Sequence, residues 1–145
     1  MGALKISSIE SGEPVHPGYG SECVTALVPA LLEGAPGPKC TPGGVSEARS
    51  VVLFVLDGLG WNQLCSRVDL VPTFAGLEGG PITTVAPTTT AAALTSITTG
   101  LPPGEHGVVG YRVALQDSVL NALRWSTSGG FGDNRPATRY FQPPL

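Results

Sequence analysis

The sequence predicts an α/β fold built around a mostly parallel sheet. Residues 51–56 form a continuous apolar run rich in β-branched residues, which is typical of a strand buried on both faces. The run ends at Asp57, and a glycine-rich turn follows it. A second short extended segment, 81–86, precedes a small-residue helix at 91–99. Strand and helix therefore alternate along the chain, as they do in parallel sheets.

The first 48 residues are predicted to form a lead-in to this domain. Residues 1–20 are polar and rich in turn formers, and 21–32 carry apolar residues at helical spacing. Pro29 lies inside that helical pattern and is expected to kink or shorten the helix. Residues 34–44 contain too much glycine and proline for regular structure, so we expect a linker there.

The partial α/β domain is predicted to span residues 49–125, and residues 126–145 are predicted to form an irregular tail without periodicity. Gly100 and the two prolines after it are expected to end the helix at 91–99. The other expected elements of the domain are short helices at 61–67 and 70–77, a turn at 87–90, a loop at 104–111 and a hairpin or extended piece at 115–125.

The charge pattern excludes several classes of function. The chain has 8 Lys and Arg and 11 Asp and Glu, with a net charge of -3, and its basic residues are scattered. A polymeric nucleic acid needs a concentrated basic face, so we expect no such partner. No membrane-spanning run and no signal peptide are recognised, which predicts a cytoplasmic protein without a membrane partner. The three cysteines (Cys23, Cys40 and Cys65) show no CxxC spacing, which argues against a disulfide framework or a zinc finger.

The composition is more apolar than the length explains. Hydrophobic residues make up 41% of the chain and charged residues only 13%. A chain of this size builds a small core, so these proportions indicate strands and helices suited to a sheet several times wider.

Asp57 is the first candidate for chemistry, because open α/β sheets bind their ligands beyond the carboxyl ends of strands. A carboxylate held there is a natural ligand for a divalent cation. An Asp-Gly pair after a strand is also an ordinary turn former, and the residue pattern alone leaves both readings open.

The threonines at the strand-to-helix junction are the second candidate. Thr88, Thr89 and Thr90 precede the helix at 91–99, where free N–H groups and the helix dipole favour an anion such as phosphate. A metal that contacts one hydroxyl would lower its pKa and make it a nucleophile. The alternative is that these threonines only cap the helix.

Three separated motifs give the chain a family resemblance. They are the run 52–60 (VLFVLDGLG), the Pro-Thr-Thr-Thr string at 87–90 and the segment 99–111 (TGLPPGEHGVVGY). In this order and spacing they resemble the start of a type I phosphodiesterase/nucleotide pyrophosphatase, a family of the alkaline phosphatase superfamily. The resemblance covers about residues 49–125. It implies the N-terminal portion of an alkaline-phosphatase-like three-layer fold, which this chain leaves incomplete.

The resemblance also implies roles for two residues. Thr90 would be the nucleophile, forming a phosphothreonine intermediate that water hydrolyses, and Asp57 and Thr90 would both ligate zinc. The complete protein would hold two divalent metals, which the resemblance implies to be zinc. It would act on a small phosphodiester or a nucleotide. The neighbouring Thr88 and Thr89 leave the register of the nucleophile open by one residue.

The chain departs from the family pattern in two ways. Ala93 stands where eukaryotic-type members have an asparagine that holds a phosphate oxygen. The family's downstream Asp and His ligands have no counterpart, because neither His16 nor His106 lies in such a motif. Catalytic zinc usually has three protein ligands, so we expect a fragment that is inactive by itself.

Other functions stay open beside this one. A non-catalytic α/β remnant or interaction module is the main alternative for the chain as it stands. Within the superfamily, a phosphomutase or a phosphonate hydrolase remains an alternative, whereas a sulfatase is disfavoured because no Cys-x-Pro-x-Arg site occurs. The sequence does not indicate the oligomeric state.

Overall fold

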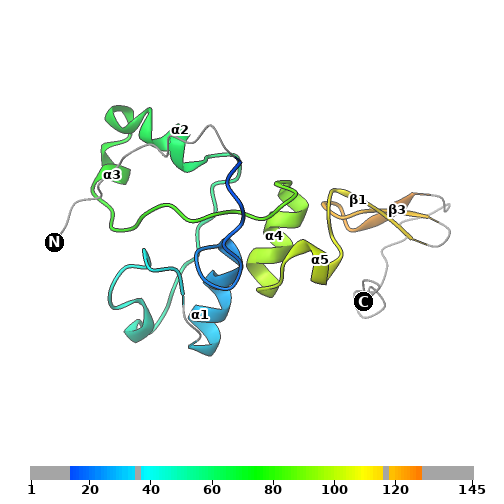
Figure 1. The fold of residues 1–145 in the computed structure, drawn as a ribbon, viewed down its shortest axis with the longest axis horizontal. Helices are drawn as coiled ribbons and strands as arrows, with labels where there is room; N and C mark the ends of the chain where they lie inside the picture. The colour runs from blue at the N-terminus through cyan, green and yellow to red at the C-terminus, as the bar shows by residue number, and fades with distance from the viewer. Residues whose placement is uncertain (1–13, 35–36, 116–117, 129–145) are drawn as a thin grey trace.

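The computed structural model describes residues 14–34, 37–115 and 118–128 and shows a mixed α/β chain. Within these residues, five α-helices precede a small three-stranded antiparallel sheet (Figure 1). The α-helices are α1 (Leu27–Glu33), α2 (Trp61–Cys65), α3 (Pro72–Ala75), α4 (Thr90–Thr99) and α5 (Pro103–His106). Short 3-10 helices lie at Val24–Ala26, Val45–Glu47 and Val68–Leu70. The strands are β1 (Arg112–Ala114), β2 (Val119–Asn121) and β3 (Ser126–Ser128).

Helix α4 lies at the centre of the molecule and contacts both α1 and α5 (Figure 1). Its small side chains allow close packing, and Ala92 joins Cys23 and Val85 in the buried core. The Thr89 side chain caps its start, and Gly100 ends it in the left-handed conformation at φ 75°. The expected helix at 91–99 is therefore confirmed, with Thr90 as one additional residue at its start.

The predicted helix at 21–32 is observed in two parts. A 3-10 turn over Val24–Ala26 leads into α1, which ends at Gly34. Pro29 is the third residue of α1, where a backbone N–H has no partner within the helix. The proline is therefore accommodated in the first turn and does not break the helix.

The apolar run 51–56 differs from its expected burial. It belongs to no strand, and its side chains are exposed, with Val52 at 89% and Phe54 at 77%. A strand buried on both faces needs neighbouring strands and covering layers, and the described part of the chain supplies neither to this segment.

The expected strand at 81–86 forms a single parallel bridge. Thr83 pairs with Cys23, and the two backbone hydrogen bonds run from Thr83 N to Glu22 O at 2.9 Å and from Val24 N to Thr83 O at 3.0 Å. The described residues contain no further parallel pairing, so the predicted parallel sheet is not shown.

The only multi-stranded sheet in the described residues is the antiparallel β1-β2-β3 meander. Val113 pairs with Leu120, and Leu120 pairs with Thr127. Leu120 is fully buried and anchors the meander. Of the range 115–125, where a hairpin or an extended piece was expected, β2 occupies 119–121, and its pairing partners β1 and β3 lie on either side of that range. Residues 126–128, at the start of the expected irregular tail, form β3 and pair with β2. Residues 129–145 lie outside the described residues.

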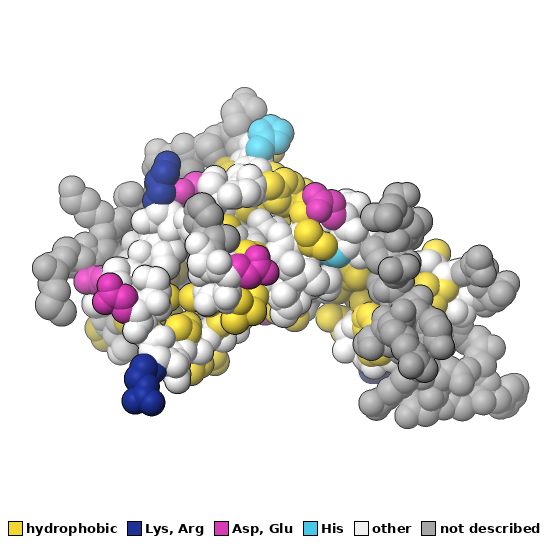
Figure 2. Space-filling view, turned by 90° about the horizontal axis from the view of Figure 1, so that it is seen from below, with side chains coloured by type: hydrophobic (Ala, Val, Ile, Leu, Met, Phe, Trp, Pro, Cys, Tyr) yellow, Lys and Arg dark blue, Asp and Glu magenta, His cyan; other side chains and the backbone are white. Residues whose placement is uncertain are grey.

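None of the helices in the described residues has the length and hydropathy needed to cross a membrane. Figure 2 shows hydrophobic side chains at the surface in several places on one face, with Lys and Arg side chains only at its margins.

Candidate functional site

Asp57 and Thr90 meet across 33 residues of sequence. The Thr90 hydroxyl donates a hydrogen bond to Asp57 Oδ2 at 2.8 Å. Asp57 lies in the turn that follows the apolar run, and Gly58 shapes that turn with a φ of 80°. The turn is closed by a bond from Leu59 N to Leu56 O at 3.3 Å. The two candidate residues named by the sequence are therefore direct neighbours.

The start of α4 gives each of its three threonines a different partner. Thr88 donates its hydroxyl proton to Val85 O at 3.0 Å. Thr89 accepts from Ala92 N and donates to Val109 O, both at 3.4 Å. Thr90 alone of the three bonds to a carboxylate. The first two hydroxyls therefore stabilise the backbone of the turn, and the third lies beside a charged oxygen.

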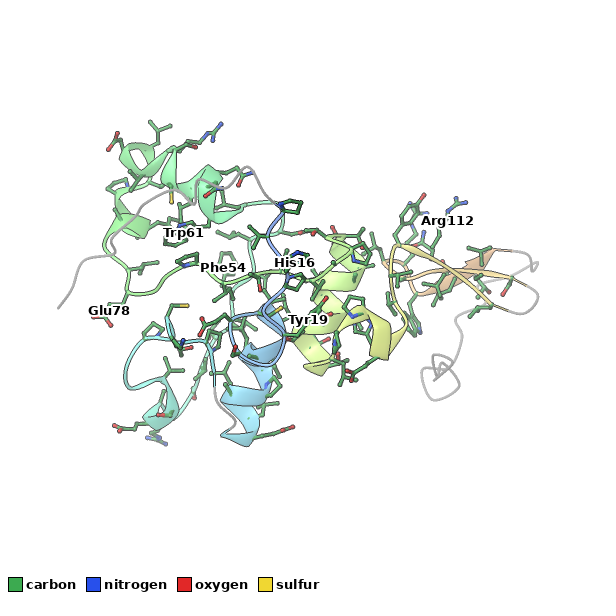
Figure 3. The ribbon with its side chains drawn as sticks, viewed as in Figure 1. His16, Tyr19, Phe54, Trp61, Glu78 and Arg112 are labelled. Atoms are coloured by element: carbon green, nitrogen blue, oxygen red, sulfur yellow. The ribbon has the colours of Figure 1, made fainter. Side chains whose placement is uncertain are left out.

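A hollow of about 840 Å³ opens beside this pair. Its polar end is formed by Asp57 and residues 88–90. Aromatic side chains form part of its wall, among them Phe54 and Trp61, which Figure 3 labels. Among the described residues, no Lys, Arg or His lines the hollow. An anionic ligand would therefore meet the Asp57 carboxylate without a compensating protein cation.

The donor set at Asp57 and Thr90 fits part of a metal site. Carboxylate and hydroxyl oxygens suit a divalent cation, and the two oxygens are already adjacent. Within the described ranges, however, no group of three or more His, Cys, Asp and Glu side chains is placed to hold a metal. The residues thus fit two ligands of one cation and do not complete a catalytic zinc site.

His106 is engaged elsewhere in the structure. It is buried, its Nδ1 accepts a hydrogen bond from Val108 N at 3.1 Å, and its Nε2 lies 2.8 Å from Ser96 Oγ. Because a backbone N–H can only donate, Nδ1 carries no proton, and Nε2–H donates to Ser96. Burial lowers the pKa of His106, which favours this neutral form.

The remaining sequence candidates, His16 and Ala93, differ in their position relative to the Asp57–Thr90 pair. His16 is exposed and does not line the hollow, whereas Ala93 does. The side chain of Ala93 offers no hydrogen bond to a phosphate oxygen. Asp117 and Asp133, the two aspartates that follow Thr90 in the sequence, lie outside the described residues.

Sequence reasoning missed two side chains that hold the site's surroundings. The Tyr19 hydroxyl accepts a hydrogen bond from Ala86 N at 3.1 Å and so fixes the approach to the threonine turn. Ser96 is fully buried and pairs with His106. A serine inside an apolar helix face was the only signal for the second contact, and the long-range contact of Tyr19 left no signal in the sequence.

Comparison with known proteins gives one positive finding. The family model for type I phosphodiesterase / nucleotide pyrophosphatase matches residues 51–130, which is more than half of the 145 residues. Neither the curated proteins nor the solved structures compared with the chain gave a match. The matched segment contains both Asp57 and Thr90 and ends just beyond β3. The chain belongs to the type I phosphodiesterase / nucleotide pyrophosphatase family.

Proposed function

We propose that this chain carries the nucleophile and the first metal ligands of a phosphodiester-cleaving site. The observation that carries the proposal is the hydrogen bond from Thr90 to Asp57 at the start of α4, in a chain of this family. Thr90 is the proposed nucleophile. The backbone partners of Thr88 and Thr89 support this register, because their hydroxyls are already used to hold the turn.

The proposed reaction is a double displacement at phosphorus. The Thr90 oxygen attacks the phosphorus of a small phosphodiester or nucleotide, the Oγ–P bond forms, and the bond to the leaving alcohol breaks. The proton of the Thr90 hydroxyl leaves with that alcohol. Water then cleaves the phosphothreonine ester, which releases a phosphomonoester and restores the hydroxyl.

Asp57 has two proposed parts in this arrangement. Its carboxylate orients the Thr90 hydroxyl through the 2.8 Å hydrogen bond. Together with the Thr90 hydroxyl it would also hold a divalent cation, which the family relationship implies to be zinc. When bound, the cation would neutralise the carboxylate and lower the pKa of the hydroxyl. The absence of Lys, Arg and His from the described lining of the hollow supports a metal as the source of positive charge.

The rest of the two-metal site is proposed to come from residues beyond those described. In the complete domain, residues 49–125 would form part of an alkaline-phosphatase-like three-layer fold, and 51–56 would be a strand of its parallel sheet. The lead-in at 1–48 and the tail at 126–145 are proposed to lie outside this partial domain. The chain alone is then expected to bind zinc weakly and to show no phosphodiester turnover.

The exposed run 51–56 favours the second candidate, a non-catalytic α/β remnant or interaction module. The two candidates differ in what the Thr90 hydroxyl does. In a remnant it only pairs with Asp57, so its loss changes local structure and no reaction.

The test is hydrolysis of bis(4-nitrophenyl) phosphate with added zinc by the longer enzyme that carries this segment. Thr90→Ala is expected to lower kcat about 10³-fold or more, since the nucleophile is lost, and Thr90→Ser should retain part of it. Thr88→Ala is the matched control and should keep most of the activity. Full activity in Thr90→Ala, or its loss only in Thr88→Ala, would overturn the proposed nucleophile.

A further inference from the structure

A buried polar pair joins helix α4 to helix α5. His106 is the last residue of α5, and its Nε2 lies 2.8 Å from the hydroxyl oxygen of Ser96 on α4. Ser96 is fully buried, and His106 is 6% exposed. Among the described residues, no buried side-chain nitrogen or oxygen lacks a hydrogen-bond partner, so the pair is satisfied. Because described residues already cover both groups, this contact does not depend on the exposed surfaces of the chain.

The same imidazole also holds the loop that follows α5. Gly107 has a φ of 73° and turns the chain at the end of this helix. The next amide, Val108 N, donates to His106 Nδ1 at 3.1 Å, and the Val108 side chain is buried. A neutral imidazole offers one donor and one acceptor, and both are used here. One ring therefore bonds to a helix through one nitrogen and to a loop through the other.

The loop that His106 holds reaches the start of α4. Val109 O accepts the hydroxyl proton of Thr89 at 3.4 Å, and Thr89 is the residue that caps α4. Helix α4 is thus attached to α5 and its loop at two points, Thr89 and Ser96. These points are about two helical turns apart and lie along the same side of α4.

Thr90 follows the capping residue directly and meets Asp57 at 2.8 Å. A hydroxyl–carboxylate hydrogen bond is short and directional, so a shift of about 1 Å at the start of α4 would break it. Because Thr89 and Thr90 share one planar peptide unit, a contact that fixes Thr89 also limits the movement of Thr90. The attachment at Thr89 therefore bears on the Asp57–Thr90 pair.

We propose that His106 is a positioning residue that places the Thr90 hydroxyl against Asp57, acting through the loop after α5 and the Thr89 cap. The proposal rests on the proposed function where it treats Thr90 as the nucleophile. His106 does not line the hollow beside Asp57, so it is not placed to contact a substrate there. It acts only through the residues that it holds.

Two substitutions separate the two hydrogen bonds of the ring. Relative to the backbone, the side-chain oxygen of asparagine takes the position of Nδ1, and the side-chain nitrogen of glutamine takes that of Nε2. His106→Asn therefore keeps the bond from Val108 N and loses the bond to Ser96. His106→Gln keeps Ser96 and loses the loop. Since the loop leads to the cap, we expect the larger effect on Thr90 in His106→Gln.

Amide hydrogen exchange of the 145-residue chain tests the geometry without any activity. The amides of Ala92 and Ala93 both bond to Thr89, so His106→Gln should speed their exchange about tenfold or more. The Gly100 amide, at the other end of α4, should change little. His106→Asn should have the smaller effect at the start of the helix. Equal changes at both ends in His106→Gln, or a larger effect of His106→Asn at the start, would overturn the proposal.

The longer enzyme that carries this segment tests the consequence for catalysis. With zinc and bis(4-nitrophenyl) phosphate, His106→Gln should lower kcat about tenfold or more and change KM less than about twofold, because the ring positions the nucleophile and binds no substrate. His106→Asn should keep most of kcat. Leu120→Ala is the stability control, since it removes a fully buried side chain of the meander that does not line the hollow. It should lower the free energy of unfolding and leave kcat unchanged.

A double-mutant cycle tests whether the effect passes through Thr89. If it does, His106→Gln should lower kcat no further in a Thr89→Ala background, whereas independent effects would multiply. Multiplying effects, or full kcat in His106→Gln while Thr90→Ala is inactive, would overturn the positioning role alone. Full activity in Thr90→Ala would overturn the proposed function itself, and hydrogen exchange would still decide whether His106 holds the start of α4.

Discussion

Residues 88–90 are chemically identical side chains with three different roles in the structure. Thr88 and Thr89 bond to carbonyl oxygens of the backbone, while Thr90 bonds to Asp57. The sequence predicted that one of these hydroxyls would meet Asp57 but left the register open. Only the conformation at the helix start separates them, because successive side chains leave the chain in different directions there.

His106 is the residue whose protonation bears most directly on stability. The Nδ1 atom of His106 accepts a hydrogen bond from Val108 N. A proton on Nδ1 would therefore place two hydrogen-bond donors, Nδ1–H and the Val108 N–H, opposite each other. The loop it holds includes Val109, whose carbonyl accepts from the capping residue Thr89. The buried imidazole therefore supports the start of α4 through the loop after α5.

The pH dependence of unfolding is the first prediction at this scale. Because burial lowers the pKa of His106 below its ordinary value of 6.5, the unfolded chain binds the proton more readily than the folded chain. The stabilising contribution is complete above pH 6.5 and falls as the pH drops toward the lowered value, by at most about 1.4 kcal/mol per pH unit. Urea unfolding between pH 5 and pH 8, about the range in which histidine titrates, measures it.

Two substitutions make this measurement specific. His106→Gln keeps a donor for Ser96 and does not titrate, so it should flatten the pH dependence in this range. His16→Gln changes an exposed histidine and should leave the dependence as it is. An unchanged slope in His106→Gln would refute the assignment to His106.

At the scale of elements, helix α4 was predictable because its signals are local. A capping threonine, a run of small residues and a following Gly100 specify both ends within about a dozen residues. The run 51–56 was equally clear as a strand in the sequence, but a strand depends on pairing partners far away in sequence or outside the described residues. The structure assigns no strand to this segment, because local pattern does not supply those partners.

Gly100 yields a prediction about the packing of α4 on α1. It has a φ of 75°, and an added Cβ would lie 2.5 Å from Cγ of Pro29. Gly34 is the matched control, because it ends α1 with a φ of 67° and has open space where a Cβ would be. Gly34→Ala should cost about 1 kcal/mol for the left-handed backbone alone. Gly100→Ala should cost about 2–3 kcal/mol, because the proline must also move.

Denaturant midpoints of the two variants measure this difference. A larger loss in Gly100→Ala shows that the contact with Pro29 fixes α4 against α1 at the glycine. Equal losses in the two variants would mean that only the backbone conformation matters there.

At the scale of the whole molecule, the chain brings together part of a site and part of a fold. Asp57 and Thr90 come from segments that the sequence identified separately, and the structure joins them at 2.8 Å. The parallel sheet that the sequence predicted is represented by one bridge, between Cys23 and Thr83. The apolar composition is consistent with this, because much of the hydrophobic surface in the described residues stays exposed.

The sequence could indicate the two candidate residues, Asp57 and Thr90, but it could not indicate a complete metal site. The proposed nucleophile and its nearest proposed ligand are local features of two turns, so motifs are able to indicate them. Further ligands need residues from other parts of a fold, and the described residues contain no cluster that supplies them. We therefore expect a weak cation site at Asp57 and Thr90 in this chain.

Manganese titration of the ¹⁵N-labelled chain tests the proposed cation site most directly. Paramagnetic Mn²⁺ broadens the amide signals nearest to it, and it prefers oxygen ligands. The signals of Asp57, Thr90 and their neighbours should broaden first, and Asp57→Asn should remove the effect, whereas Glu47→Gln should leave it unchanged. Broadening centred on other carboxylates, or broadening that persists in Asp57→Asn, would contradict the account.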